Sequence, residues 1–302
     1  MEKDNTVIIA IICCLLWASV YSTIKVGLQY DTPIHFAGVR FIIGGLMILP
    51  FTVRPTAFVA MVREHWKIVL LVTLLQGVTN YTLFYIGMDL VPGAIGAVVV
   101  GSQPLFTALV SASMDKEDKL TKRKIITIFI ALMGLVLISA GRQALKLGSL
   151  AELLGIFLIL GANLATSVSN VMISLKGKKI NPFVLSSTSI LISGVILFLA
   201  SLVFEQRPEN VSLPAPYWIS LLWLSFVSAA AFSLWYMLLK RPGVKVSELN
   251  LWKFLIPVVG AILSWIILPE EHPEWITIAG MVIIAGSLVL FHWKGKAKDL
   301  RQ

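Results

Sequence analysis

Three basic residues stand inside long apolar stretches of this sequence: Lys25, Arg40 and Lys253. A charged side chain is costly in an apolar medium unless an opposite charge or a polar cavity meets it. Their positions therefore predict compensation of an anionic group, such as the carboxylate of a small molecule. Pairing within the protein is the alternative, with Glu248 as a candidate partner of Lys253, and Lys25 could instead extend to a polar interface.

Aromatic and amide side chains accompany these cations at helical spacing. Trp17, Tyr21 and Lys25 follow an i, i+4, i+8 pattern, which places them on one face of a helix. Such side chains can line a binding cavity, whereas hydrogen bonding between helices is the alternative for the amides. The candidate substrate-binding residues are Trp17, Tyr21, Lys25, Arg40, Gln76, Asn80, Tyr81, Gln103, Asn163, Asn170, Trp235, Asn250, Trp252 and Lys253.

Two prolines occupy equivalent positions in two similar segments. Pro104 begins PLFTALVSASMDKED and Pro257 begins PVVGAILSWIILPEE, at a constant offset of 153 residues, and each segment ends in acidic residues. A proline inside an apolar helix removes a backbone hydrogen bond and kinks or interrupts the helix. We therefore predict helix breaks at Pro104 and Pro257 beside a central site, with a role in packing as the alternative.

The sequence contains none of the motifs that serve soluble enzymes. P-loop, HExxH, CxxC and nucleophile-elbow patterns are absent, the four histidines fall near the ends of apolar stretches, and the two cysteines are adjacent. We therefore predict no catalytic residue, no metal site and no cofactor.

Long apolar helices are the elements that would position these residues. Of 302 residues, 57% are hydrophobic and 14% are charged, and the mean hydropathy is +0.87. Soluble domains carry roughly 25% charged residues, and a helix that crosses a membrane needs about 20 largely apolar residues. We predict an all-α integral membrane protein with short connections and ten transmembrane helices, near residues 7–28, 33–52, 67–88, 93–113, 124–140, 150–174, 182–203, 217–238, 248–268 and 275–293.

Basic residues distinguish the two sides of the predicted membrane domain. With the N-terminus in the cytoplasm, 19 of the 25 Lys and Arg residues lie on the cytoplasmic side, and three, Arg142, Lys146 and Arg207, lie on the other. Cytoplasmic loops carry such an excess. The distribution predicts cytoplasmic termini, and it explains the pI near 9.6 without a nucleic-acid partner.

The chain divides into two similar halves of five spans each. Beyond the segments that begin with the two prolines, GLVLIS from Gly134 matches GSLVLF from Gly286. Because five is odd, the second copy would cross the membrane in the opposite orientation, as an inverted-topology repeat. We predict five-helix repeats over residues 7–140 and 150–293, followed by a basic cytoplasmic tail at 294–302.

Several motifs carry a family likeness: WASVYSTIK (Trp17–Lys25), GVRF (Gly38–Phe41), NLWKFLIP (Asn250–Pro257) and the two proline–acid segments. Through these motifs the sequence resembles the drug/metabolite transporter superfamily, in particular its ten-helix EamA-type exporters. The resemblance extends from about residue 7 to residue 293. The resemblance implies an inner-membrane carrier of amino acids, other metabolites or drugs, with both termini in the cytoplasm.

Together these observations predict a secondary-type transporter that exports small organic metabolites, such as amino acids, by alternating access. It would lie in the plasma (bacterial inner) membrane, with a small-molecule substrate and membrane lipid as partners and no nucleic acid. An importer or a drug-efflux carrier of the same fold is the first alternative. A membrane-embedded enzyme and a non-transporting assembly protein are the others, and both leave the embedded charges and matched prolines unexplained.

Overall fold

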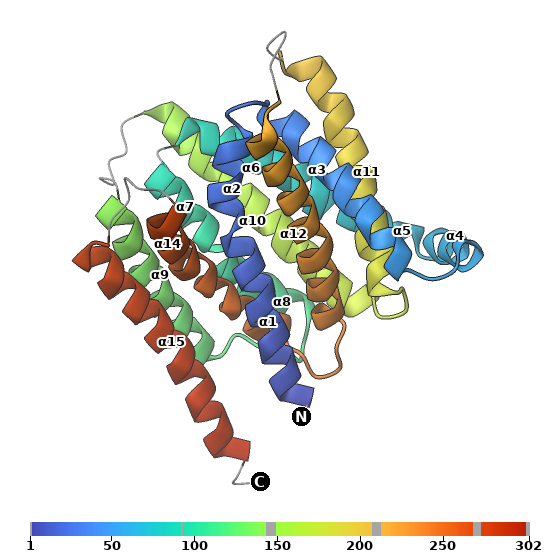
Figure 1. Cartoon of the computed structure of the whole chain (residues 1–302). Coiled ribbons are helices and arrows are strands. Elements are labelled where there is room, and N and C mark those ends of the chain that lie inside the picture. Colours follow the sequence, from blue (N-terminus) through green and yellow to red (C-terminus); the bar gives the residue numbers. More distant parts are fainter. Residues whose placement is uncertain (1, 92, 143–148, 207–212, 268–272, 300–302) are drawn as a thin grey trace. The chain divides into compact units, whose positions relative to one another are not determined.

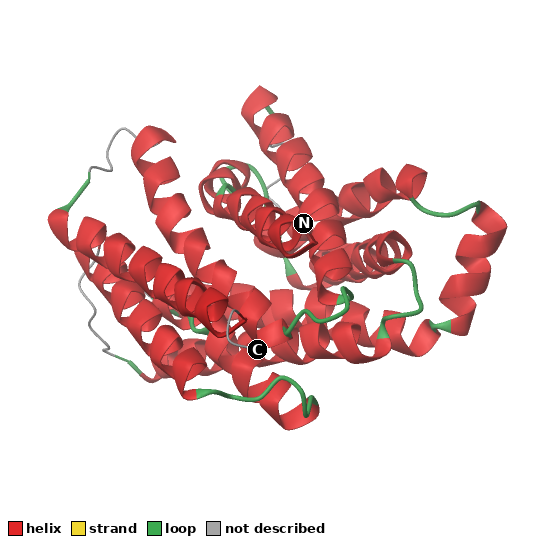
Figure 2. Ribbon diagram, turned by 90° about the horizontal axis from the view of Figure 1, so that it is seen from below, coloured by secondary structure: helices red, strands yellow, loops and turns green. Residues whose placement is uncertain are grey.

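The computed structural model describes residues 2–91, 93–142, 149–206, 213–267 and 273–299. Every regular element in these ranges is a helix, as Figures 1 and 2 show. The prediction of an all-α protein is confirmed for this part of the chain.

The helices follow the predicted apolar runs closely, and most of their ends fall within a few residues of the predicted ones. In chain order they are α1 (Glu2–Ala18), α2 (Val20–Gly27), α3 (Pro33–Ile48), η1 (Leu49–Phe51), α4 (Pro55–Glu64), α5 (Trp66–Val72), η2 (Thr73–Thr79), α6 (Asn80–Leu90), α7 (Gly93–Gly101), α8 (Gln103–Met114), α9 (Lys122–Arg142), α10 (Leu150–Lys176), α11 (Pro182–Phe204), α12 (Ala215–Leu239), α13 (Val246–Leu251), η3 (Trp252–Phe254), α14 (Leu255–Ile267) and α15 (Trp275–Asp299).

Length and composition identify the helices that can cross a membrane. Eight helical stretches of the described residues are long and apolar enough, and two shorter apolar helices, Asn5–Ala18 and Trp275–Phe291, complete the series. Each predicted run therefore overlaps an apolar helix, although the first run, 7–28, is divided between α1 and α2. The count of ten membrane crossings stays a prediction, because the two terminal helices are short by this measure.

The connection between α3 and α5 contains a helix that the sequence analysis did not predict. α4 begins at Pro55, whose fixed φ suits the first helical turn, and ends at Glu64. Its Met61 sulfur accepts a hydrogen bond from the backbone N–H of Asn181, 3.1 Å away, just before α11. With 10 residues, α4 is too short to span a bilayer, so a search for long apolar runs overlooks it.

The helices form two compact units, and each unit combines parts of both predicted repeats. The first unit comprises residues 1–85 and 172–244, and the second comprises residues 86–171 and 245–302. The repeats are a prediction about internal similarity, whereas the units reflect packing, so their boundaries need not coincide.

In the first unit, α3 and α11 pack against each other in antiparallel orientation. A Cβ atom added to Gly38 would lie 2.6 Å from the backbone nitrogen of Phe198, and one added to Gly45 would lie 2.8 Å from that of Leu191. Contacts that advance along α3 therefore move backwards along α11. Glycine makes this close approach of two backbones possible.

In the second unit, α9 and α15 cross in the same way. A Cβ atom on Gly134 would lie 2.6 Å from the carbonyl oxygen of Gly280, and one on Gly280 would lie 2.4 Å from that of Gly134. Ile138 lies beside Gly280 and Ile284 beside Gly134, so these two helices are antiparallel as well. The crossing forms part of a buried apolar cluster that includes Ile138 and Ile284.

The α9–α15 crossing predicts opposite effects for two Gly-to-Ala substitutions on α15. Gly280→Ala should lower the stability of the detergent-solubilised chain by roughly 1–3 kcal/mol, because the added methyl group meets backbone atoms that must move apart. Gly286→Ala should leave stability unchanged or raise it, because nothing lies within 4 Å of the added Cβ and alanine favours the helix. Thermal unfolding measures both variants, and equal melting temperatures would contradict the crossing.

Candidate functional site

Arg40 is buried in the middle of α3, with only 3% of its surface exposed. Its Nη2 donates a hydrogen bond of 3.4 Å to the hydroxyl of Tyr81. The guanidinium lies over two rings, with Cζ 4.6 Å from the centroid of Phe41 and 5.5 Å from that of Tyr81. Within the described residues, Nε and Nη1 of Arg40 have no hydrogen-bond partner. Arg40 is therefore a buried cation with two nitrogens that no described residue accepts from, which is a costly state.

The two aromatic residues that contact the Arg40 guanidinium also line a recess. Phe41 and Tyr81 line it together with Gln76, Ser193 and Phe232 among others, and its cavity volume is about 10 Å³, enough for a water-sized molecule. Within the described residues, Oε1 of Gln76 has no hydrogen-bond partner. The recess therefore combines aromatic walls with an available hydrogen-bond acceptor.

Gln76 reaches this recess from a π-helical segment, η2. The hydroxyl of Ser193 on α11 donates a hydrogen bond of 3.2 Å to the carbonyl of Thr73, the first residue of this segment. π-Helical turns are rare and occur often at functional sites. Gln76 was a predicted site residue, but its sequence context does not indicate the wider turn on which it lies.

The other predicted residues of the first unit extend the aromatic surface. Trp17 meets Phe232 and Trp235 edge to face, with ring centroids 5.9 and 5.1 Å apart. Asn80 begins α6 and is half-buried. Tyr21 and Lys25 belong to α2, but their side chains lie outside the described residues.

The second unit contains a polar cluster of its own, formed by most of the remaining predicted residues. Nζ of Lys253 donates a hydrogen bond of 3.2 Å to Oε1 of Gln103, and Nδ2 of Asn170 donates one of 3.4 Å to Oδ1 of Asn250. Asn170 and Asn250 are buried, and Trp252 next to the cluster in sequence is half-buried. These bonds connect different helices, which fits the helix-joining alternative as well as a binding role.

Both spans that carry the predicted prolines are interrupted. α7 ends at Gly101 and α8 begins at Gln103, so Pro104 lies in the first turn of the new helix. α13 and α14 are separated by η3, and Pro257 is the third residue of α14. Polar residues gather at both breaks: Lys253 lies in η3, and Asn163 donates to the carbonyl of Val99 at 2.7 Å and to the hydroxyl of Ser102 at 3.2 Å.

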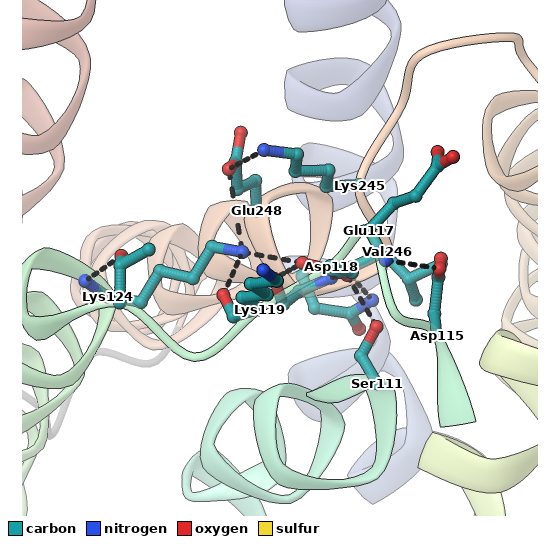
Figure 3. A network of polar contacts seen from close by, with 12 residues as sticks. Ser111, Asp115, Glu117, Asp118, Lys119, Lys124, Lys245, Val246 and Glu248 are labelled. Atoms are coloured by element: carbon teal, nitrogen blue, oxygen red, sulfur yellow. Dashed lines mark hydrogen bonds and ion pairs between the residues drawn. The ribbon is translucent and has the colours of Figure 1, made fainter. Parts of the chain in front are cut away.

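A buried network around Asp118, shown in Figure 3, was missed by the sequence analysis. The Asp118 carboxylate accepts hydrogen bonds from Nζ of Lys124 at 2.5 Å, from the hydroxyls of Ser111 and Ser247 at 2.5 Å, and from the backbone N–H of Ser247 at 2.9 Å. Burial alone would raise the pKa of Asp118, but these hydrogen bonds outweigh it and hold the pKa below its ordinary value. Ser247 is 129 residues away in the sequence, so no local pattern reveals the contact.

Glu248, the partner suggested for Lys253, lies beside two other lysines of this network. Its Oε1 lies 3.5 Å from Nζ of Lys124 and 3.8 Å from Nζ of Lys245. Nζ of Lys253 donates a hydrogen bond to Oε1 of Gln103.

The first unit therefore places the Arg40 guanidinium against aromatic side chains, and the second places the Lys253 ammonium group against an amide. Among the described residues, no group of three or more His, Cys, Asp or Glu residues is placed to hold a metal ion. Two segments of the chain, residues 5–140 and 153–293, match the EamA-like transporter family. The chain belongs to this family. Its resemblance to EamA-type carriers is confirmed, and the protein is a multi-pass membrane transporter of that family.

Curated members similar to this chain are also named as transporters. It is 26% identical to the uncharacterized transporter YvbV of Bacillus subtilis, covering 99% of this chain and 95% of YvbV. It is 27% identical to the uncharacterized inner membrane transporter YedA of Escherichia coli K12, covering 91% and 87% of the two chains. A crystal structure of a protein with 18% sequence identity aligns with a TM-score of 0.82, over 96% of this chain and 98% of that one, so the two chains share a fold.

Proposed function

We propose that this EamA-type chain is a secondary-type exporter of small organic metabolites, such as amino acids, and works by alternating access in the bacterial inner membrane. Membership of a transporter family supports transport, and the names of the relatives favour a carrier over an enzyme. The relative named as an inner membrane transporter supports the location.

The observation that carries the substrate class is the state of Arg40. Its guanidinium is buried, two of its nitrogens have no partner in the described residues, and it contacts two residues that line the recess. A carboxylate would satisfy these donors with charge-assisted hydrogen bonds. Gln76 offers an acceptor for the ammonium group of an amino acid in the same recess. In the second unit, Lys253 provides a further cation beside Gln103.

Alternating access is supported by the way equivalent helices pack. α3 and α11 correspond to the second predicted transmembrane helix of each repeat. α9 and α15 correspond to the fifth. Each pair is antiparallel, as expected if the second repeat crosses the membrane in the opposite direction to the first. The interrupted helices at Pro104 and Pro257 add a matched discontinuity in the two repeats, which is a common feature of carriers with a central site.

The orientation of the chain gives a prediction that needs no substrate. Reporter fusions at Gln302 and within Lys116–Lys124 should report the cytoplasm, and a fusion within Glu205–Ser212 should report the outside, because basic residues mark the cytoplasmic side. Activity of an alkaline phosphatase or a green fluorescent protein at each point is the measurement. An external C-terminus would contradict the ten-span arrangement.

Transport by the purified chain in proteoliposomes tests the proposed function. Vesicles loaded with labelled amino acids and with their amide or ester analogues should release the free acids faster than vesicles prepared without protein. The matched control is a vesicle with the Arg40→Met variant. If no acid is released faster than from protein-free vesicles, the proposal for this substrate class is wrong.

A further inference from the structure

The short helix α13 is bounded by two points at which the backbone changes direction. On one side is the turn at Gly243, whose φ of 73° lies in the left-handed region that favours glycine. On the other side is η3, which separates α13 from α14. A helix of 6 residues between two such points can rotate as a small rigid piece.

The network around Asp118 holds α13 in its present position. Ser247 is the second residue of α13, and both its backbone N–H and its hydroxyl donate to Asp118. Asp118 is itself held by Ser111 on α8 and by Lys124 on α9. In Figure 3, Ser111 and Lys124 approach the Asp118 carboxylate from two separate elements.

The chain around α13 carries two candidate site residues. Asn250 is the fifth residue of α13 and accepts a hydrogen bond from Asn170. Lys253 follows in η3 and binds Gln103. A movement of α13 therefore displaces the polar cluster of the second unit as well.

We propose that Asp118 is a positioning residue that keeps α13 closed, and that release of Ser247 from Asp118 lets α13 swing about η3 and opens access to the polar cluster around Lys253. The inference rests on the proposed transport function, for which it names the moving part. Lys124 has a supporting role: besides Asp118 it binds the carbonyl of Lys119 at 3.0 Å, and so it fixes the loop that presents the carboxylate. The two hydrogen bonds from Ser247 on α13 to Asp118 on the loop must break on opening.

Accessibility of a cysteine on α13 tests this proposal without any substrate. Leu249 is 4% exposed in α13, and a Leu249→Cys chain with Cys13 and Cys14 replaced by Ala carries one reporter thiol. The rate at which a membrane-impermeant maleimide labels this thiol is measured in inside-out and right-side-out vesicles. Ser247→Ala removes one bond to Asp118 and leaves the Asp118–Lys124 pair intact, so labelling should become about tenfold faster. Ser247→Thr keeps the hydroxyl and should label at the original rate.

Asp118→Asn should accelerate labelling at least as strongly as Ser247→Ala. The matched control is Glu117→Gln, which removes the same charge one position earlier, at an exposed side chain. If Asp118→Asn does not fold, Ser247→Ala and Ser247→Thr decide the question. Equal labelling of Ser247→Ala, Ser247→Thr and Glu117→Gln would overturn the proposal. Because labelling needs no substrate, a failure of the unaltered chain to export amino acids would refute the proposed function separately.

Discussion

Arg40→Met is expected to reduce export of a carboxylate substrate at least tenfold without destabilising the protein. A carboxylate that leaves water for a buried site loses several kcal/mol unless a cation meets it. A lost pairing of about 1.4 kcal/mol already weakens binding roughly tenfold. The folded protein should tolerate the change, because two nitrogens of Arg40 have no partner in the described residues and methionine removes a buried charge.

The comparison of acids with neutral analogues separates a binding role from a structural one. Initial export rates of a labelled amino acid and of its amide are measured in proteoliposomes and normalised to the amount of folded carrier. Arg40→Met should lower the export rate of the acid far more than that of the amide. Arg40→Lys should give an intermediate export rate of the acid, because lysine keeps the positive charge but lacks the planar guanidinium group that binds both carboxylate oxygens. Arg63→Met, at an exposed position of α4, is the control. Equal losses for acid and amide together with a lower melting temperature would show that Arg40 is structural.

The positions of the long helices could be predicted from the sequence because the bilayer imposes a simple rule. A span must be apolar over about 20 residues and must satisfy its own backbone hydrogen bonds. The run predicted at 182–203, for example, is α11 (Pro182–Phe204), which begins with a proline and a capping Asn181. The breaks near Pro104 and Pro257 followed from proline chemistry in the same way.

Other features lie outside the reach of that rule. α4 is too short to count as a span, and the π-helical turn of η2 has an ordinary apolar composition. The site residues were predicted from their type and from their spacing within apolar stretches, so the sequence could indicate Arg40 but not the rings over which it lies. The contact between Asp118 and Ser247 depends on how distant segments fold together, and the sequence analysis used Asp118 only as a marker of the repeat.

Asp118→Asn is expected to cause a large loss of stability, about 3–5 kcal/mol, because it removes the nearer and fully buried carboxylate from the buried ammonium group of Lys124 and leaves only Glu248, 3.5 Å away. Lys124 is only 2% exposed and Asp118 is 0% exposed, so water cannot replace the lost partner easily. Lys124→Met should cost a similar amount for the converse reason. The double variant Asp118→Asn/Lys124→Met should be more stable than the sum of the two single changes predicts, since neither residue then leaves an unpaired charge.

The dependence of stability on pH checks the same pair independently. The pKa of Asp118 is lowered on folding, so its ionisation stabilises the protein fully above the ordinary value of 3.8, and this contribution is lost as the pH falls through the lower pKa of the folded state. The unaltered chain should therefore lose stability below about pH 4 more steeply than the double variant, which lacks the carboxylate. Thermal unfolding of both proteins between pH 2.5 and 7, on buffers of matched ionic strength, measures the difference, with Glu117→Gln again as the control. Parallel curves for the two proteins would mean that ionised Asp118 does not stabilise the fold, and additive losses in the double variant would show that Asp118 and Lys124 act independently.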